Sequence, residues 1–205
     1  MAEGLTNRDR FNRAMHFLPV DRCPVWHIGE WEETLDRVLP LVQPRPDFAG
    51  FWEDMAYKTG PLLSPKHFRE FLLPNYKKVT ACLRDWGIDA IFVDSDGNID
   101  QLIPLWLEGG VNGFHPLEVA AGMDPVALRK RYGRSVLLRG GIDKRKLAQG
   151  GQALRDEVLS KVPFLARSGG YVPYIDHETP PDVSWANFQE YARLVREAVM
   201  IRDGE

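Results

Sequence analysis

The sequence predicts an α/β fold in which helices cover a parallel sheet, because short apolar strands alternate with helical segments along most of the chain. Carboxylates, often with glycine, closely follow each predicted strand. In parallel α/β folds ligands bind beyond the carboxyl ends of the strands, so the same pattern predicts a site at that edge. The five strands are expected at residues 48–52, 90–93, 111–114, 135–138 and 171–174.

Helical segments separate these strands. Ser64 and Pro65 begin the first of them, with serine as the N-cap and proline at the first helical position. Pro74 is expected to divide or kink this segment, whose apolar stripe continues to Trp86. The other helices are expected at about 99–107, 125–132, 153–167 and from 184 onward.

The N-terminal part of the chain has a different pattern. Short helices are expected at residues 6–16 and 31–39, the first one opened by the cap-like Thr6. Three prolines then crowd into residues 40–46, and proline this dense excludes a helix or a central strand. We therefore expect an irregular junction there, just before the first strand.

The chain is short for a closed barrel. An eight-stranded (β/α) barrel takes about 250 residues and seldom fewer than about 200. This chain has 205 residues and shows five convincing strands. We expect an incomplete TIM-type (β/α) barrel of about five βα units plus N-terminal helices, formed as one domain over residues 1–205.

Composition excludes several classes of partner. The net charge is −3, from 26 basic and 29 acidic residues without a cationic run, which leaves no electrostatic footprint for nucleic acid or an anionic membrane. Cys23 and Cys82 are isolated, which favours a reducing compartment and gives no metal-binding spacing. The first residues lack the features of a signal peptide, and no apolar run approaches the roughly 20 residues that span a bilayer. A cytoplasmic address is expected.

Several motifs resemble those of the uroporphyrinogen decarboxylase superfamily. The similarity covers roughly residues 5–35 and 48–200, and the blocks follow the order of that superfamily. Its members are complete (β/α) barrels with further βα units between the opening block and the strand at 48–52, so the resemblance implies an internal deletion of early strands. The motifs are LTNRDRF (5–11), PVDRCPVW (19–26), EDMAYKTG (53–60), DSDGN (94–98), GGIDKR (140–145) and DHETPPDV (176–183).

Two branches of the superfamily are relevant. His177 falls where the decarboxylases carry a histidine in their last block, but their early arginine for substrate carboxylates is missing. His27, Ile28, Gly29 and Glu30 stand there instead, and Glu30 would repel an anionic tetrapyrrole. This argues against uroporphyrinogen as the substrate.

The other branch transfers methyl groups between corrinoid proteins and thiols, with zinc held by a His-x-Cys pair and a later cysteine. The positions that match these ligands are Asp94, Asp96 and His177. Two carboxylates and an imidazole suit a divalent ion such as zinc, iron or manganese. The resemblance therefore implies a metal site at these three residues and a separate corrinoid protein as partner.

Further residues at the strand ends are candidates for the chemistry. Glu53 and Asp54 are expected to act as acid–base groups, and Asp176 is expected to orient His177. Residues 94–98 also suit a plain turn, and Asp143 also suits the start of the helix at residue 144. The residues expected to contact a small-molecule substrate are His27, Glu30, Asn98, Glu118 and Asp143.

Three functions are compatible with these residues. The first is a metal-assisted methyl (group) transfer that involves a corrinoid protein. The second is a metal-free decarboxylation of the uroporphyrinogen decarboxylase type. The third is an inactive, shortened barrel that serves in binding or assembly, because an incomplete barrel exposes sheet edges that a partner or a second copy has to cover.

Overall fold

A computed structural model describes residue 40 and residues 46–200 of the chain. The two predicted N-terminal helices and most of the predicted junction at 40–46 lie outside these residues. None of the helices in the described part is long and apolar enough to cross a membrane.

The centre of the fold is a five-stranded sheet in which all neighbouring strands are parallel. The strands follow one another in chain order, β1-β4-β5-β6-β7, as in a barrel wall and unlike the reversed order of a doubly wound sheet. All five predicted strands are confirmed, the later ones shorter than expected. Their bounds are β1 (Phe48–Trp52), β4 (Ala90–Asp94), β5 (Gly113–His115), β6 (Leu137–Arg139) and β7 (Tyr171–Val172).

A small antiparallel hairpin, β2 (Ala56–Tyr57) and β3 (Gly60–Pro61), follows β1 and was not predicted. It supports the loop after β4, because Asn98 N donates to Tyr57 O at 2.9 Å. Gly97 lies so close to the hairpin that a Cβ there would be 2.6 Å from Ala56 O, and its φ of +78° also favours glycine.

The helix after the hairpin begins where the sequence predicts. Ser64 Oγ accepts a hydrogen bond from His67 N at 3.2 Å, which caps α3 (Pro65–His67). A π-helical segment (Phe68–Leu72) then leads into α4 (Leu73–Asp85), with Pro74 in its first turn. The predicted division at Pro74 is therefore present as a change of helix type, since proline lacks the amide hydrogen that a continuous α-helix needs.

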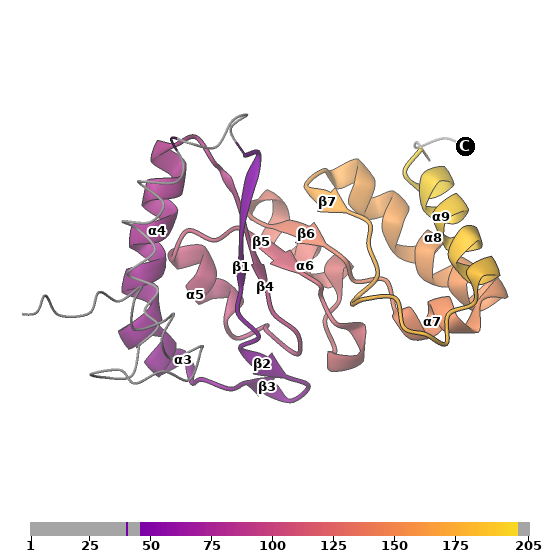
Figure 1. Cartoon of the computed structure of the whole chain (residues 1–205), viewed down its shortest axis with the longest axis horizontal. Coiled ribbons are helices and arrows are strands. Elements are labelled where there is room, and N and C mark those ends of the chain that lie inside the picture. The colour runs from indigo at the N-terminus through magenta and orange to yellow at the C-terminus, as the bar shows by residue number, and fades with distance from the viewer. Residues whose placement is uncertain (1–39, 41–45, 201–205) are drawn as a thin grey trace, which may run out of the picture.

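The remaining helices pack around the sheet. Figure 1 shows α4 and α5 to one side of the strands and α8 and α9 at the opposite end of the molecule. The helix predicted at 99–107 begins later, at Ile103, and Pro104 occupies its first turn. Asp124 Oδ1 caps α6 by accepting from Val126 N at 2.8 Å. The bounds are α5 (Ile103–Glu108), α6 (Pro125–Tyr132), α7 (Lys144–Gln149), α8 (Gly151–Ser168) and α9 (Trp185–Ala198).

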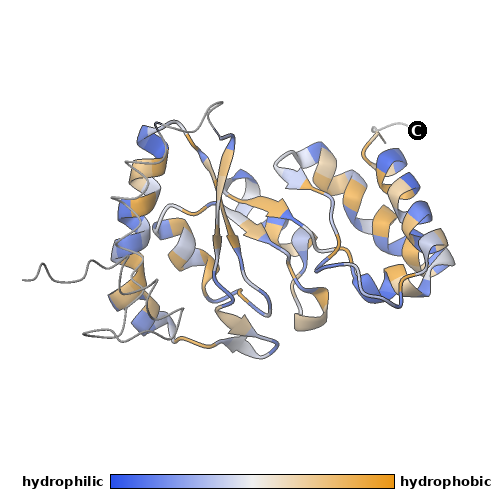
Figure 2. Cartoon of the chain, in the orientation of Figure 1, coloured by the Kyte–Doolittle hydropathy of each residue, from blue (hydrophilic) through white to orange (hydrophobic). Residues whose placement is uncertain are grey.

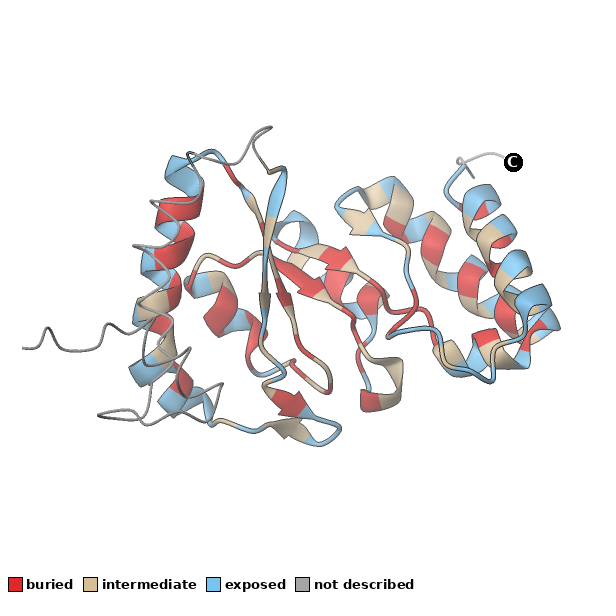
Figure 3. Ribbon diagram, viewed as in Figure 1, coloured by how far each residue is buried: buried red, intermediate tan, exposed pale blue. Residues whose placement is uncertain are grey.

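The buried core lies on the helix side of the sheet, which we call the outer face. Apolar and polar residues alternate around the long helices (Figure 2), and buried residues gather on the strands and on the helix sides that face them (Figure 3). Trp106 is fully buried there, with ring-centroid distances of 5.6 Å to Phe68 and 6.2 Å to Phe114. Ile91, Val93, Phe114 and Leu138 supply the outer face of the sheet.

The opposite side of the sheet, the inner face, corresponds to the inside of a barrel. Strand register brings one residue of each strand into a single row across it, which we call the inner row. Phe48 is 63% exposed and Trp52 84% exposed, so the described part of the chain leaves the inner face open. The inner row consists of Trp52, Asp94, His115, Arg139 and Val172.

The described residues therefore form part of a (β/α) barrel. Among them, β1 and β7 are the edges of the sheet and do not pair with each other. The carboxyl ends of β1 and β4 point to the same edge, where Figure 1 shows the β2–β3 hairpin. This edge, with the inner row just below it, positions the candidate site.

Candidate active site at the strand ends

Three loops bring Asp54, Asp96 and His177 together. His177 Nε2 lies 3.1 Å from Asp96 Oδ2, although the two residues are 81 positions apart in the chain. Asp54 Oδ1 accepts a hydrogen bond from Asp96 N at 3.2 Å. The side chains of Asp96 and His177 are about 40% exposed (38% and 41%), so they are in contact with each other and also open to solvent. The structure thus joins three of the predicted site residues.

Asp54 has an unusual backbone. Its φ is +34°, a value that residues with a side chain seldom adopt. Asp54 lies two residues after the end of β1, and its carboxylate accepts the hydrogen bond from Asp96 N. Strained backbone of this kind clusters at functional sites, which adds weight to the candidate site at this position.

Asp94, in the inner row, lies beside this group. Its Oδ1 is 3.8 Å from His115 Nδ1 on the neighbouring strand. Burial raises the pKa of Asp94, and the nearby negative charges of Asp54 and Asp96 raise it further, against the opposing effect of Arg139 and His177. Asp94 therefore links the strand-end carboxylates to the inner row.

His115 and Arg139 are inner-row residues that were not predicted as site residues from the sequence. Burial, together with the positive charge of Arg139, lowers the pKa of His115 to about 4, so the imidazole is neutral near pH 7. The Arg139 guanidinium carbon lies 4.7 Å from the centroid of the Tyr174 ring. The signal for Arg139 is a charged residue at an inward position of an otherwise apolar strand.

The loop after β4 is fixed by hydrogen bonds to its neighbours. Glu118 Oε2 accepts from Gly97 N at 3.1 Å, and Asn98 Nδ2 donates to Ala121 O at 3.0 Å. Lys144 Nζ lies 3.9 Å from Glu118 Oε1. Glu118 and Asn98 thus shape the loop that carries Asp96, and their contact with a substrate stays a prediction.

Asp176 is fully buried and its carboxylate is occupied by backbone groups. Its oxygens accept from Val119 N at 2.9 Å and from Lys144 N at 3.0 Å. Burial raises its pKa, while these two hydrogen bonds act in the opposite direction. The carboxylate that contacts His177 is Asp96, and Asp176 instead holds together the loops beneath the site.

Asp143, another predicted site residue, has clear structural partners. Asp143 caps α7, and Arg145 binds its carboxylate through Nη2 at 2.7 Å. Burial acts to raise the pKa of Asp143, but the hydrogen bonds and charge of Arg145 outweigh this and place it below its ordinary value. The alternative that Asp143 starts the helix at residue 144 is confirmed.

Glu53 lies close to Tyr76, a residue of α4 that packs edge-on against Phe51 at 5.3 Å. Burial raises the pKa of Glu53, and the Tyr76 hydroxyl beside it partly opposes the rise. The buried Tyr76 hydroxyl makes no well-formed hydrogen bond to any described residue. Glu53 therefore lies toward the helix side of the sheet, whereas Asp54 reaches the Asp96–His177 contact. His27 and Glu30 lie outside the described residues.

The predicted metal ligands are not gathered as a set of three. In the described ranges, no group of three or more histidine, cysteine, aspartate or glutamate side chains is arranged to hold a metal ion. Asp96 and His177 are in contact, whereas Asp94 lies beside His115. As arranged here, the three residues do not fit a metal ion, and metal binding stays a prediction.

The site is open to solvent and lies outside two nearby hollows. A hollow of about 280 Å³ lies beside the hairpin and is lined in part by Gly60 and Gln101. Another of about 320 Å³ lies against α6 and includes Asn98 and Arg131. Neither is lined by Asp96 or His177, so a substrate would reach these groups from the open side.

Comparison with known proteins places the chain in a family. Residues 51–198 match the family model described as uroporphyrinogen decarboxylase (URO-D). The chain belongs to the URO-D family. The match covers the four sequence blocks from 53–60 to 176–183. The blocks at 5–11 and 19–26 lie outside it.

A solved structure supports the fold of this URO-D family member. A methyltransferase from Methanosarcina mazei is similar, with a TM-score of 0.52 and 16% sequence identity. The similarity covers 83% of this chain but 46% of that protein, so the chain spans about half of its length. At this identity the likeness shows the fold alone. A comparison with curated proteins finds no match.

Proposed function

We propose that this URO-D family member is a group-transfer enzyme that methylates a small molecule at the carboxyl ends of its strands. The contact between Asp96 and His177 carries the proposal, because the fold joins the two from distant loops at the edge where parallel α/β proteins bind ligands. The resemblance to methyl-transferring members of the superfamily and the similarity to a methyltransferase support the choice of a methyl group.

His177 is the proposed general base. In the neutral tautomer that carries its hydrogen on Nε2, this nitrogen donates to Asp96 Oδ2, and Nδ1 is left to accept a proton. Asp96 fixes the tautomer and stabilises the imidazolium that forms. Exposure of both side chains lets a substrate reach the pair.

The proposed reaction moves one proton and one methyl group. An acceptor with a heteroatom–hydrogen bond gives its proton to His177, and the heteroatom then forms a bond to the methyl carbon. The bond between the methyl group and its donor breaks, and the donor keeps that electron pair. A corrinoid carried by a separate protein would supply the methyl group, as the resemblance implies.

No step of this proposal depends on a metal ion. Asp94, Asp96 and His177 do not converge, so the chemistry assigned to the chain is the proton transfer at His177. A divalent ion would require Asp94 to leave His115 and join the other two residues. The test therefore includes zinc, iron and manganese as added components.

The test uses the full chain with methylcobalamin as a soluble methyl donor and a panel of small thiols and amines as acceptors. Demethylation is followed by absorbance, and methylated products by mass spectrometry, with and without each metal ion. We expect His177→Gln to lower the rate by about 10²-fold or more and Asp96→Asn to lower it by about 10-fold. The matched controls His67→Gln and Asp156→Asn, at exposed positions on α3 and α8, keep the wild-type rate.

Equal rates in the wild type and His177→Gln would overturn the assigned base. A parallel assay measures carbon dioxide release from uroporphyrinogen by the same proteins. Carbon dioxide release without methyl transfer would replace this proposal with a decarboxylase. If an added metal ion raises the methyl-transfer rate of the wild type but not of Asp94→Asn or His177→Gln, the predicted three-ligand metal site would be supported.

A further inference from the structure

The inner row contains one permanent cation, Arg139, at a position where barrels hold apolar side chains. Inward positions of closed (β/α) barrels are filled mainly by bulky aliphatic residues. The row places Arg139 between His115 and Val172, and the described part of the chain leaves it partly exposed. A charge in this environment requires a partner to offset its loss of water.

Arg129 shows what a structural arginine looks like in the same molecule. The residue is 5% exposed, and its guanidinium donates to the backbone oxygens of Val136, Gly169 and Gly170, each at 2.9 Å. By contrast, no hydrogen bond or ion pair between described residues occupies the guanidinium of Arg139, which rests on the Tyr174 ring. The donors of Arg139 are therefore free for a ligand within the described structure.

The surroundings of Arg139 favour a small, planar anion. Tyr174 covers one face of the guanidinium at 4.7 Å, which orients its hydrogen-bonding edge. On the neighbouring strand, the His115 imidazole can share a hydrogen bond with the same ligand. Phe92, whose ring centroid is 6.3 Å from that of His115, adds an apolar wall on the inner face.

The position links this cation to the proposed reaction site. Asp94 interacts electrostatically with Arg139 and also with His177. Arg139, on the sheet, and His177, on the loop after β7, therefore both lie near one carboxylate. A molecule of modest size can reach both from the open inner face.

We propose that Arg139, with Tyr174 and His115, forms a subsite for a carboxylate group of the substrate. The inference rests on the proposed function and narrows its substrate to small molecules that carry a carboxylate at one end and a methyl-accepting heteroatom at the other. The planar guanidinium fork matches a carboxylate in a bidentate geometry. A phosphate dianion fits less well, because Asp94, which interacts with Arg139, has Asp54 and Asp96 as neighbours, and these carboxylates repel a doubly charged anion more strongly than a singly charged one.

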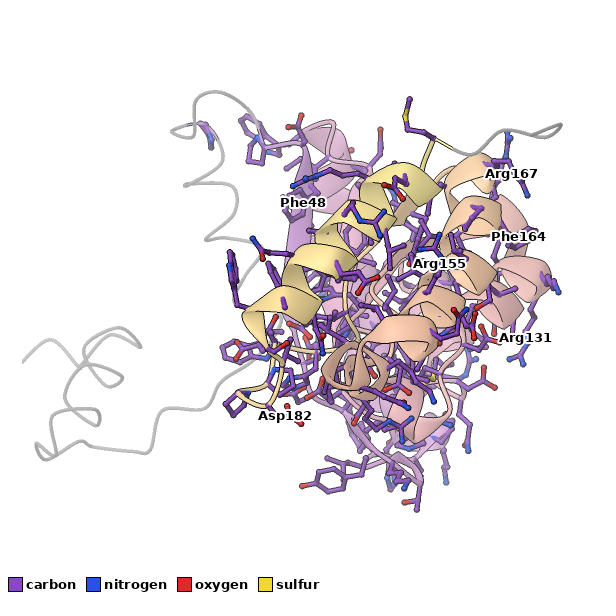
Figure 4. The ribbon with its side chains drawn as sticks, turned by 90° about the vertical axis from the view of Figure 1, so that its right-hand side faces the viewer. Phe48, Arg131, Arg155, Phe164, Arg167 and Asp182 are labelled. Carbon is purple, nitrogen blue, oxygen red and sulfur yellow. The ribbon has the colours of Figure 1, made fainter. Side chains whose placement is uncertain are left out.

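Calorimetric titration of the full chain tests the subsite, with acetate, benzoate and inorganic phosphate as probes and no methyl donor present. We expect saturable binding of at least one carboxylate, weakened about tenfold or more in Arg139→Gln. Arg139→Lys keeps the charge but loses the planar fork, so its affinity is also expected to fall. The control Arg155→Gln removes one positive charge from the exposed surface of α8 (Figure 4) and leaves binding unchanged.

Thermal unfolding of each variant shows that it is folded. Equal carboxylate affinity in the wild type and Arg139→Gln would overturn the subsite, as would the lack of saturable carboxylate binding at millimolar concentrations. Tighter binding of phosphate than of either carboxylate would overturn the assignment to a carboxylate. If carboxylate binding depends on Arg139 but no methyl transfer is detected, the subsite is supported and the proposed function is rejected. If methyl transfer is detected but carboxylate binding does not depend on Arg139, the proposed function is supported and the subsite is rejected.

Discussion

The two faces of the five-stranded sheet differ in what covers them. On the outer face, Ile91, Val93, Phe114 and Leu138 are at most 1% exposed, because α4, α5 and the following helices pack against the sheet. On the inner face, Trp52 is 84% exposed within the described chain. Burial of apolar area is the main source of folding stability, so the outer face supplies most of it. The candidate site lies on and above the inner face, where polar groups remain available.

The two arginines show the same difference at the level of single residues. Arg129 is buried, and its donors go to backbone carbonyls that join the end of α6 to β6 and β7. Arg139 keeps its donors on the inner face, beside residues of the candidate site. A change at the first should alter stability, and a change at the second should alter binding.

The largest effect is expected from truncation on the outer face. Trp106→Ala should lower the free energy of unfolding by about 3–5 kcal/mol, because it removes a fully buried indole that contacts Phe68 and Phe114. Denaturant titration followed by circular dichroism measures the loss. The matched variant Trp52→Ala, on the inner face, should change stability by less than about 0.5 kcal/mol. Similar losses at both positions would show that the inner face is covered.

A smaller effect is expected from the two arginines. Arg129→Met should cost about 2–4 kcal/mol, because several buried backbone carbonyls lose their donor at once. Arg139→Met should stay within about 0.5 kcal/mol of the wild type, since its guanidinium holds no described hydrogen bond. Urea denaturation of the two variants provides the comparison. A larger loss at Arg139 would mean that its role is structural.

The smallest expected effect is on the pH dependence of stability. It tests Glu53, which lies on the helix side of the sheet and away from the open site. Burial raises the pKa of Glu53 in the folded state above its ordinary value of 4.5. Between pH 4.5 and the raised pKa, the folded state therefore binds more protons than the unfolded state. Stability should therefore fall over that window, by at most about 1.4 kcal/mol per pH unit for one group.

Glu53→Gln removes this titration and should make the fall shallower. Thermal melting between acidic and neutral pH measures the slope. Asp47→Asn, at an exposed position before β1, serves as the control and should leave the slope unchanged. An identical slope in Glu53→Gln and the wild type would show that Glu53 does not contribute to it.

The sequence predicted the strands well because apolar runs bounded by turn residues identify buried strands. The β2–β3 hairpin escaped prediction because strands of two residues carry no periodic pattern. The helix at 103–108 was placed too early because Ile99 and Leu102 extend its apolar pattern, although Pro104 indicates the true first turn.

The candidate site was predicted only in part. Asp54, Asp96 and His177 follow predicted strands closely, and Asp96 and His177 also match ligand positions of the superfamily motifs, so the sequence sufficed to select them. The inner row depends on register, since it exists only when Asp94 pairs with His115 and Phe114 pairs with Leu138. Register is set by three-dimensional packing, which a single sequence does not display, so Arg139 and its stacking on Tyr174 were missed.

Asp176 has a consequence for how the site opens. Its carboxylate accepts from Val119 N after β5 and from Lys144 N after β6, while its own amide donates to Ile142 O at 2.8 Å. One buried side chain therefore joins the segments that follow three successive strands. The Val119 and Lys144 amide hydrogens exchange with solvent when this carboxylate releases them, so deuterium uptake at the two positions should report one shared free energy of opening. The base of the site then opens as a single cooperative unit.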